Sequence, residues 1–138
     1  MKLKELMRVL ITEEMRDVSV YKEEAAVFGA ASGPGEKIRE VFLRVSEEKK
    51  KRLKLLGRMS KEGTGFRQRK TETARSIEAS LRLHETCADR TIRLYRDLHK
   101  LINNPESKAE VIAVISGERA VLAEIKALRL LVEKAKKA

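Results

Sequence analysis

Apolar residues recur at every third or fourth position along four long segments of the chain, which predicts four amphipathic helices. We expect these helices near residues 3–31, 36–60, 71–102 and 106–136. The apolar stripe of the first segment consists of Met7, Ile11, Val18, Tyr21, Ala25 and Phe28. Each stripe needs an apolar surface to pack against, so the four helices are expected to bury their stripes against one another.

Turn-forming residues separate the four segments. SGPG at 32–35 predicts a tight turn, and two glycines interrupt the pattern in KEGTGFRQRK, 61–70. In INNPES, 102–107, the asparagines suit the end of one helix and the proline suits the first turn of the next. The outer two connections are short, so we expect two antiparallel hairpins. The middle connection, near 61–71, is long enough to run the length of a helix, which permits a crossover between the hairpins.

The pattern therefore predicts an all-α protein of one domain, 1–138: an antiparallel bundle of two helix hairpins joined by a crossover. The composition agrees, because 38% of the residues are charged, 42% are hydrophobic and 4% are aromatic. No apolar run approaches the roughly 20 residues of a membrane span, and the first residues lack a signal-peptide pattern. The single cysteine, Cys87, excludes an intrachain disulfide. We therefore expect a cytoplasmic protein without a membrane partner.

The net charge of +10 is uneven along the chain. Residues 44–76 hold 12 basic and 4 acidic residues, whereas the rest of the chain holds 19 and 17. Such a region can attract a polyanion or an acidic protein partner. It contains no recognition motif, however, so a solvated helix face beside a basic loop is the simpler interpretation.

Four stretches of sequence carry a resemblance to a known family. They are VFLRVSEEKKKRLKLLGRMS (41–60), VISGERAVLAEIKALRLL (114–131), and AAVFGAAS and TIRLYRDL, which contain Phe28 and Tyr95. In this framework the chain resembles the ferritin-like, rubrerythrin-type bundles over nearly its whole length. The resemblance implies a ferritin-like fold, and it implies two metal ions held by a Glu from the first helix and a Glu-x-x-His pair from the second helix of each hairpin.

The ligand positions implied by the resemblance are mostly held by other residue types. In the register that aligns Phe42 with the aromatic residue of the family, the six positions are Tyr21, Lys49, Arg52, Ala88, Glu118 and Val121. Only Glu118 matches, and shifting the second helix by one residue still provides no histidine. Charged Lys and Arg side chains repel metal ions and cannot replace carboxylate or imidazole ligands. The resemblance thus implies a degenerate di-iron site, and we expect neither a metal nor another cofactor.

Helical spacing places two carboxylates among apolar residues. Glu14 shares a face with Met7, Tyr21 and Phe28, and Glu118 lies inside the stripe of the fourth segment. The cations at 49–52 span more than one helical turn, so at least one of them is expected to point inward. We hypothesise that Lys49 or Arg52 pairs with Glu14 or Glu118, because a buried carboxylate without a counter-charge is costly. Alternatively, the three lysines of this run extend along the helix edge to solvent.

Other candidate chemistry is weaker. His84 and Cys87 share a helix face and could form a metal or nucleophilic site, but a mid-helix Cys is typical of a core and we expect His84 to be a hydrogen-bonded core residue. KEGTGFRQRK lacks the spacing of a phosphate-binding loop, and no strand precedes it. No serine–histidine–aspartate arrangement and no carboxylate pair has a useful spacing for catalysis.

Three interpretations of function follow. The first is a non-catalytic, metal-free ferritin-like bundle with a structural or binding role. We expect it to be a homo-oligomer, with a dimer as the first guess, because a second apolar stripe contains Ile112, Leu130 and Leu131. The second is a di-metal oxidoreductase or iron-handling protein with atypical ligands such as Glu14, His84 and Glu118. The third is a basic helical protein that binds nucleic acid.

Overall fold

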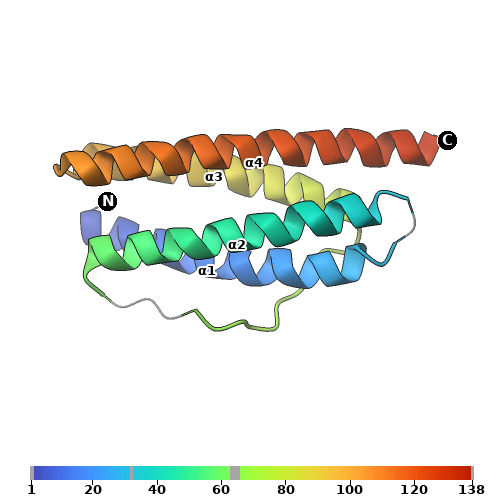
Figure 1. Cartoon of the computed structure of the whole chain (residues 1–138), viewed down its shortest axis with the longest axis horizontal. Helices are drawn as coiled ribbons and strands as arrows, with labels where there is room; N and C mark the ends of the chain where they lie inside the picture. The colour runs from blue at the N-terminus through green and yellow to red at the C-terminus, as the bar shows by residue number, and fades with distance from the viewer. Residues whose placement is uncertain (1, 32, 63–65, 138) are drawn as a thin grey trace.

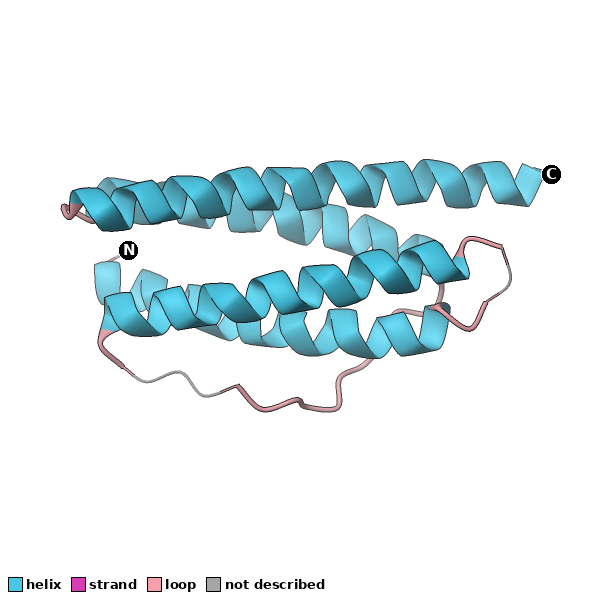
Figure 2. Ribbon diagram, in the orientation of Figure 1, coloured by secondary structure: helices cyan, strands magenta, loops and turns pink. Residues whose placement is uncertain are grey.

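The computed structural model describes residues 2–31, 33–62 and 66–137, and within these ranges it has four helices and no strand. The helices are α1 (Leu3–Phe28), α2 (Gly35–Ser60), α3 (Ile77–Leu101) and α4 (Pro105–Lys137). The pairs α1–α2 and α3–α4 pack most closely and run antiparallel (Figures 1 and 2). This confirms the expected all-α four-helix bundle of two hairpins. None of the helices, as far as they are described, is long and apolar enough to cross a bilayer.

The described residues 66–76 of the connection from α2 to α3 lie along the α1–α2 hairpin, and α3 begins at the end of the bundle where α2 also begins (Figure 1). Hydrogen bonds to α1 hold this crossover in place. The Gln68 side-chain amide donates to the backbone carbonyl of Ser19 at 3.2 Å, and the Thr71 N–H donates to the Glu23 carboxylate at 3.0 Å. The two hairpins are therefore joined by a crossover, as the length of this connection permits.

Two helix boundaries differ from the expected ones. Helix α3 begins at Ile77 instead of near 71, because Ser76 is its N-cap and accepts a 3.1 Å hydrogen bond from the Ala79 N–H. Helix α1 ends at Phe28 instead of near 31, because the turn into α2 already begins at Gly29 and includes Gly33 in the left-handed region at φ 79°.

The interior of the bundle is divided into three layers along its axis. One apolar cluster lies toward the α1–α2 turn and contains Tyr21, Phe28, Ile38, Phe42, Val45, Leu81, Val121, Ile125 and Leu128 among others. A second apolar cluster lies toward the opposite end and contains Leu6, Met7, Leu10, Leu56, Tyr95, Leu98, Ile102 and Val111. On α1, α2 and α4, charged residues that are also buried stand in the sequence between the two apolar sets. The centre of the bundle is therefore charged.

Candidate functional site

Lys49 occupies the middle of the bundle and is 1% exposed. Its Nζ lies 2.9 Å from Oε1 of Glu14, 3.0 Å from Oδ2 of Asp17 and 3.3 Å from Oε2 of Glu118. Two of these carboxylates come from α1 and the third comes from α4, so the ammonium joins three helices. A lysine has three donors, and here each of them has a carboxylate within reach.

Arg52 lies one turn further along α2 and contacts the same two glutamates. Its Nη1 donates to Oε1 of Glu118 and lies 3.4 Å from Oε2 of Glu14, while Nη2 lies 3.5 Å from Glu48. Gly117 leaves room for this arrangement, because a Cβ at that position would lie 2.7 Å from Oε1 of Glu48. The expected inward ion pair is therefore present, and both Lys49 and Arg52 take part in it.

Tyr95 completes the cluster from α3. Its hydroxyl donates to Oε2 of Glu14 at 2.9 Å, so Glu14 accepts from three side chains on two helices. Among the described residues, every buried side-chain nitrogen and oxygen has a hydrogen-bond partner. We call Glu14, Asp17, Lys49, Arg52, Tyr95 and Glu118 the ion cluster. Because the cluster is satisfied throughout, its polar atoms can be buried without the large cost of unpaired groups.

Burial and close charges oppose each other in setting the pKa values of the cluster. Burial alone raises the pKa of Glu14, but Lys49 and Arg52 outweigh it and hold that pKa below its usual value. Burial alone lowers the pKa of Lys49, but the surrounding carboxylates raise it well above the usual value. The pKa of Tyr95 is also raised well above normal, by burial and then by Glu14. At neutral pH, Glu14 is therefore ionised, Lys49 is charged and Tyr95 is a neutral hydrogen-bond donor.

The positions implied by the ferritin-like resemblance have three different environments. Lys49, Arg52 and Glu118 lie in the ion cluster, whereas Ala88 and Val121 are buried apolar residues that offer no ligand atom. Tyr21 stacks on His84, with ring centroids 4.0 Å apart. The residues do not fit two metal ions, because Lys49 and Arg52 already neutralise the carboxylates that would have to bind them.

Part of the cluster could be identified from the sequence. The apolar spacing indicated Glu14 as a core polar group but gave no role to Asp17 or to the hydroxyl of Tyr95. Asp17 lies three residues after Glu14, so the i,i+3 spacing of two acids on one face was an available signal. The role of Tyr95 had no such signal, because a tyrosine in an apolar stripe normally predicts only packing.

A second polar cluster surrounds Glu24 on α1. His84 lies in the core, as expected, with Nε2 2.7 Å from Oε1 of Glu24. Glu24 also accepts hydrogen bonds from the Ser80 hydroxyl at 2.9 Å and from the Ala74 N–H at 3.0 Å. The Glu24 cluster holds the end of the crossover against α1 and α3.

Cys87 is partly buried, and burial raises the pKa of its thiol, which disfavours the reactive thiolate.

Some cations of the basic region 44–76 lie inside the bundle, and others lie on its surface. Lys49 and Arg52 are buried, while Arg44 and Arg58 pair with Glu124 and Glu110 of α4. The Lys50 ammonium lies 5.3 Å from the centre of the Phe66 ring, which places this part of the crossover against α2. Some of the positive charge in this region therefore serves the fold and is not free for a partner.

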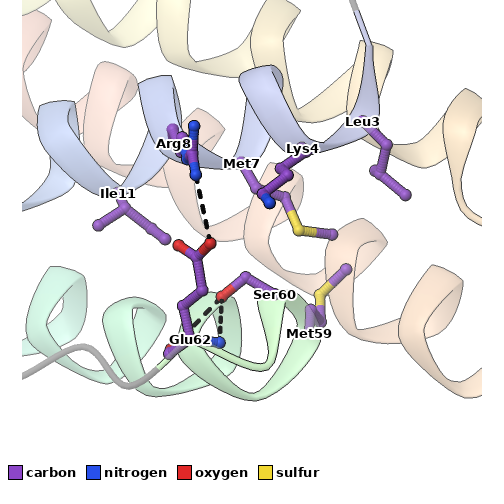
Figure 3. Close-up of a pocket in the computed structure, with 8 residues that line it drawn as sticks. All are labelled: Leu3, Lys4, Met7, Arg8, Ile11, Met59, Ser60 and Glu62. Atoms are coloured by element: carbon purple, nitrogen blue, oxygen red, sulfur yellow. Dashed lines mark hydrogen bonds and ion pairs between the residues drawn. The ribbon is translucent and has the colours of Figure 1, made fainter.

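An open pocket of about 520 Å³ lies at the end of the bundle where α1 begins and α2 ends (Figure 3). The apolar side chains of Leu3, Met7, Ile11 and Met59 line it together with Lys4, Arg8, Ser60 and Glu62. The salt bridge between Arg8 and Glu62 spans it at 3.6 Å. No member of the ion cluster lines this pocket, so it gives no access to the buried charges.

Over the described residues, no group of three or more His, Cys, Asp or Glu side chains is placed to hold a metal ion. The chain matches no protein-family model, no curated protein and no solved structure. A functional interpretation therefore depends on the residues of this chain alone.

Proposed function

We propose that this protein is a non-catalytic, metal-free helical bundle of the ferritin-like type, with a structural or binding role. The observation that carries the proposal is the pairing of Lys49 and Arg52 with Glu14 and Glu118. These two cations supply the positive charge that buried carboxylates require, at positions where the resemblance implies metal ligands. The surrounding hydrogen bonds fix their geometry, as a buried ion pair needs.

The reaction chemistry of a di-metal site has little support in these residues. A metal ion would have to displace both the Lys49 ammonium and the Arg52 guanidinium from carboxylates that they contact directly. His84, one of the possible atypical ligands, contacts Glu24 instead of the ion cluster. The di-metal alternative therefore has no observation in its favour.

The test is to measure metal content and metal response together. Protein purified without chelators should contain far less than one equivalent of iron, manganese or zinc by elemental analysis. Its thermal unfolding midpoint should not change when Mn²⁺ or Fe²⁺ is added, because a ligand that binds only the native state would raise it. Near-stoichiometric metal, or a midpoint that rises with metal concentration, would overturn the proposal.

For a structural role, the surface that supports self-association is the outer face of α4. Ile112 and Leu130 are 55% and 67% exposed there, and Leu131 is 42% exposed. Leu130 and Leu131 are adjacent and favour contact with a second copy of the chain near the C-terminal end of α4, whereas Ile112 lies about 27 Å from Leu130, beyond Arg119. Light scattering should then give the mass of a dimer, and L130E should give that of a monomer. A native monomer would contradict this part of the proposal.

We also propose that the protein is cytoplasmic, and the single cysteine is consistent with this proposal.

A further inference from the structure

A shallow groove of about 400 Å³ lies between α3 and α4 on the outside of the bundle. Three exposed arginines line it: Arg93 and Arg96 from α3, and Arg119 from α4. Ile92 and Leu122 also line it, and Asp89 is its only acidic residue. A surface concavity with three guanidinium groups and one carboxylate carries an excess of positive charge.

Three other cations of the same two helices form ion pairs, whereas Arg82, Lys100, Lys126 and Lys134 form none with a described residue. Toward the C-terminal end of α4, Arg129 pairs with Glu85, and Lys136 pairs with Glu78 at 3.0 Å. On the other side of α3, Arg90 pairs with Glu13 of α1 at 2.8 Å. Arg93, Arg96 and Arg119 also form no ion pair or side-chain hydrogen bond with any residue that the structure describes, and these three lie together in one groove.

Like charges three or four residues apart on a helix repel each other weakly, and Arg93 and Arg96 have this spacing, while Asp89 and Asp97 each lie four residues from Arg93. A bound anion would relieve the remaining repulsion among the three arginines. Each guanidinium presents a planar set of donors that matches phosphate geometry, and arginine is the preferred residue for phosphate recognition. The unpartnered arginines therefore fit a phosphate-bearing ligand.

Two exposed lysines extend the positive charge beyond the groove, with one exposed acid, Asp97, between Arg93 and Lys100 on α3. Lys100 follows Arg93 by seven residues on α3, and Lys126 follows Arg119 by seven residues on α4, and both lysines are exposed. A separation of seven residues is about two helical turns, so each lysine lies on the same side of its helix as the corresponding arginine, about 10 Å further along the axis. Cations spread along two helices suit a polymer of phosphates better than a single small anion.

We propose that the α3–α4 groove binds the phosphodiester backbone of nucleic acid without reading its base sequence. None of the lining residues is aromatic, so the groove offers no surface on which bases could stack. The binding energy then comes from phosphate contacts and the release of counterions, which makes the affinity strongly salt-dependent. This inference is independent of the ion cluster, because no residue of the cluster lines the groove.

The experiment compares two charge-reversal variants of equal net charge. The first is R93E/R96E/R119E in the groove, and the second is K50E/R67E/R69E on the crossover side of the bundle. All six residues are exposed. Circular dichroism measures whether both variants keep the helix content of the native protein. Binding to fluorescently labelled 20-nucleotide single strands and duplexes is measured by anisotropy over a series of salt concentrations.

The native protein should bind both nucleic acids, with an affinity that falls as salt rises. The groove variant should bind at least tenfold more weakly than the crossover variant. For duplex, its slope of log affinity against log salt should decrease by about 0.9 for each phosphate that the substituted arginines no longer neutralise. R93Q/R96Q/R119Q should show the same effect in weaker form, because it removes the donors without adding repulsion.

Four outcomes would overturn the proposal. The native protein fails to bind either nucleic acid. Both charge-reversal variants lose affinity equally, which would mean that net charge alone drives binding. Inorganic phosphate competes as well as oligonucleotide at equal phosphate concentration, which would indicate a small-anion site. Vesicles containing phosphatidylserine bind through the groove while oligonucleotides do not, which would indicate a membrane surface as the partner.

Discussion

The Lys49 ammonium lies 2.9 Å from the Glu14 carboxylate at a place where both side chains are 1% exposed. Bulk water therefore does not screen this pair, and the attraction between its charges is much stronger than at the surface. Removing the two charges from water is also costly, so the pair holds together only while its remaining hydrogen bonds are made. The stability of the bundle thus depends on a few polar contacts as well as on its apolar clusters.

Removing Arg52 should strongly destabilise the fold. In R52A, Glu118 keeps only Lys49 as a counter-charge, and the expected decrease in the free energy of unfolding is about 3–5 kcal/mol. Urea denaturation monitored by circular dichroism measures this decrease. The matched control is K51A, which removes an exposed cation from the neighbouring position and should change stability by about 0.5 kcal/mol or less. Equal effects of R52A and K51A would mean that the inward pairing contributes nothing.

Stability should depend on pH in opposite ways at the two ends of the scale. Glu14 and Glu24 have folded pKa values below the ordinary 4.5, so their contribution is complete above about pH 4.5 and is lost as pH falls through the folded values. Lys49 has a folded pKa well above 10.5, so its contribution is complete below about pH 10.5 and is lost as pH rises through the folded value. Urea titrations from about pH 2 to 11 should show a plateau between these limits.

Replacing single glutamates by glutamine identifies which carboxylates cause the loss of stability at acid pH, which we call the acid limb of the pH profile. E24Q should flatten the limb, because it removes one of the depressed pKa values. E5Q replaces an exposed glutamate at the start of α1 and should leave the limb unchanged. A limb of the same steepness in E24Q and in the native protein would assign acid unfolding to other carboxylates.

Removing the carboxylate of Glu24 should release the end of the crossover. In E24A, the Ala74 N–H and the Ser80 hydroxyl lose their acceptor, at about 1–3 kcal/mol for each donor that stays buried without a partner. Native-state hydrogen exchange of the peptide covering 66–76 should then become faster, while exchange in the middle of α2 changes much less. E72A, which removes an exposed carboxylate from the same crossover, is the control. Uniform acceleration across the whole chain would indicate global instead of local loosening.

Introducing a Glu-x-x-His pair should create metal affinity where we expect the native chain to have none. K49E/R52H places this motif beside Glu14, Asp17 and Glu118, so the centre becomes strongly negative and the variant should be unstable without metal. Mn²⁺ or Zn²⁺ should raise its thermal unfolding midpoint in a concentration-dependent way, because metal at 100 times the dissociation constant stabilises the native state by about 2.7 kcal/mol. K50E/K51H, with the same residue types introduced at exposed positions, should not respond. Absence of a response in both variants would argue against the proposed ferritin-like geometry.

The hairpins could be predicted from sequence because local signals define them. Apolar spacing gave each helix, and short connections such as 32–35 gave the antiparallel pairs. The sequence predicts a start of α3 near residue 71, which is too early, because Ala74 has helical spacing relative to Ile77 and Leu81. In the structure, the Ala74 N–H donates to the Glu24 carboxylate, 50 residues away in the chain. A tertiary hydrogen bond of this kind leaves no periodic pattern in the sequence.

The ion cluster was predictable only in outline. Four consecutive cations indicate that at least one of them points inward, and an acid within each of two apolar stripes indicates the partners. The rotation of α2 about its axis decides whether Lys49, Arg52 or both face the core, and sequence spacing does not fix that angle closely. The alternative in which the lysines extend to solvent holds for Lys50 and Lys51, which are exposed, and fails for Lys49.

The ion cluster draws its charged residues from three helices, and this constrains how the sequence can diverge. Replacing Lys49 or Arg52 leaves three buried carboxylates with one cation, and replacing Glu14 or Glu118 removes a carboxylate that both cations contact. Viable descendants must therefore replace these residues together or keep all of them. Homologues of this chain should show the four positions inherited as a block, even where the rest of the bundle has changed beyond alignment.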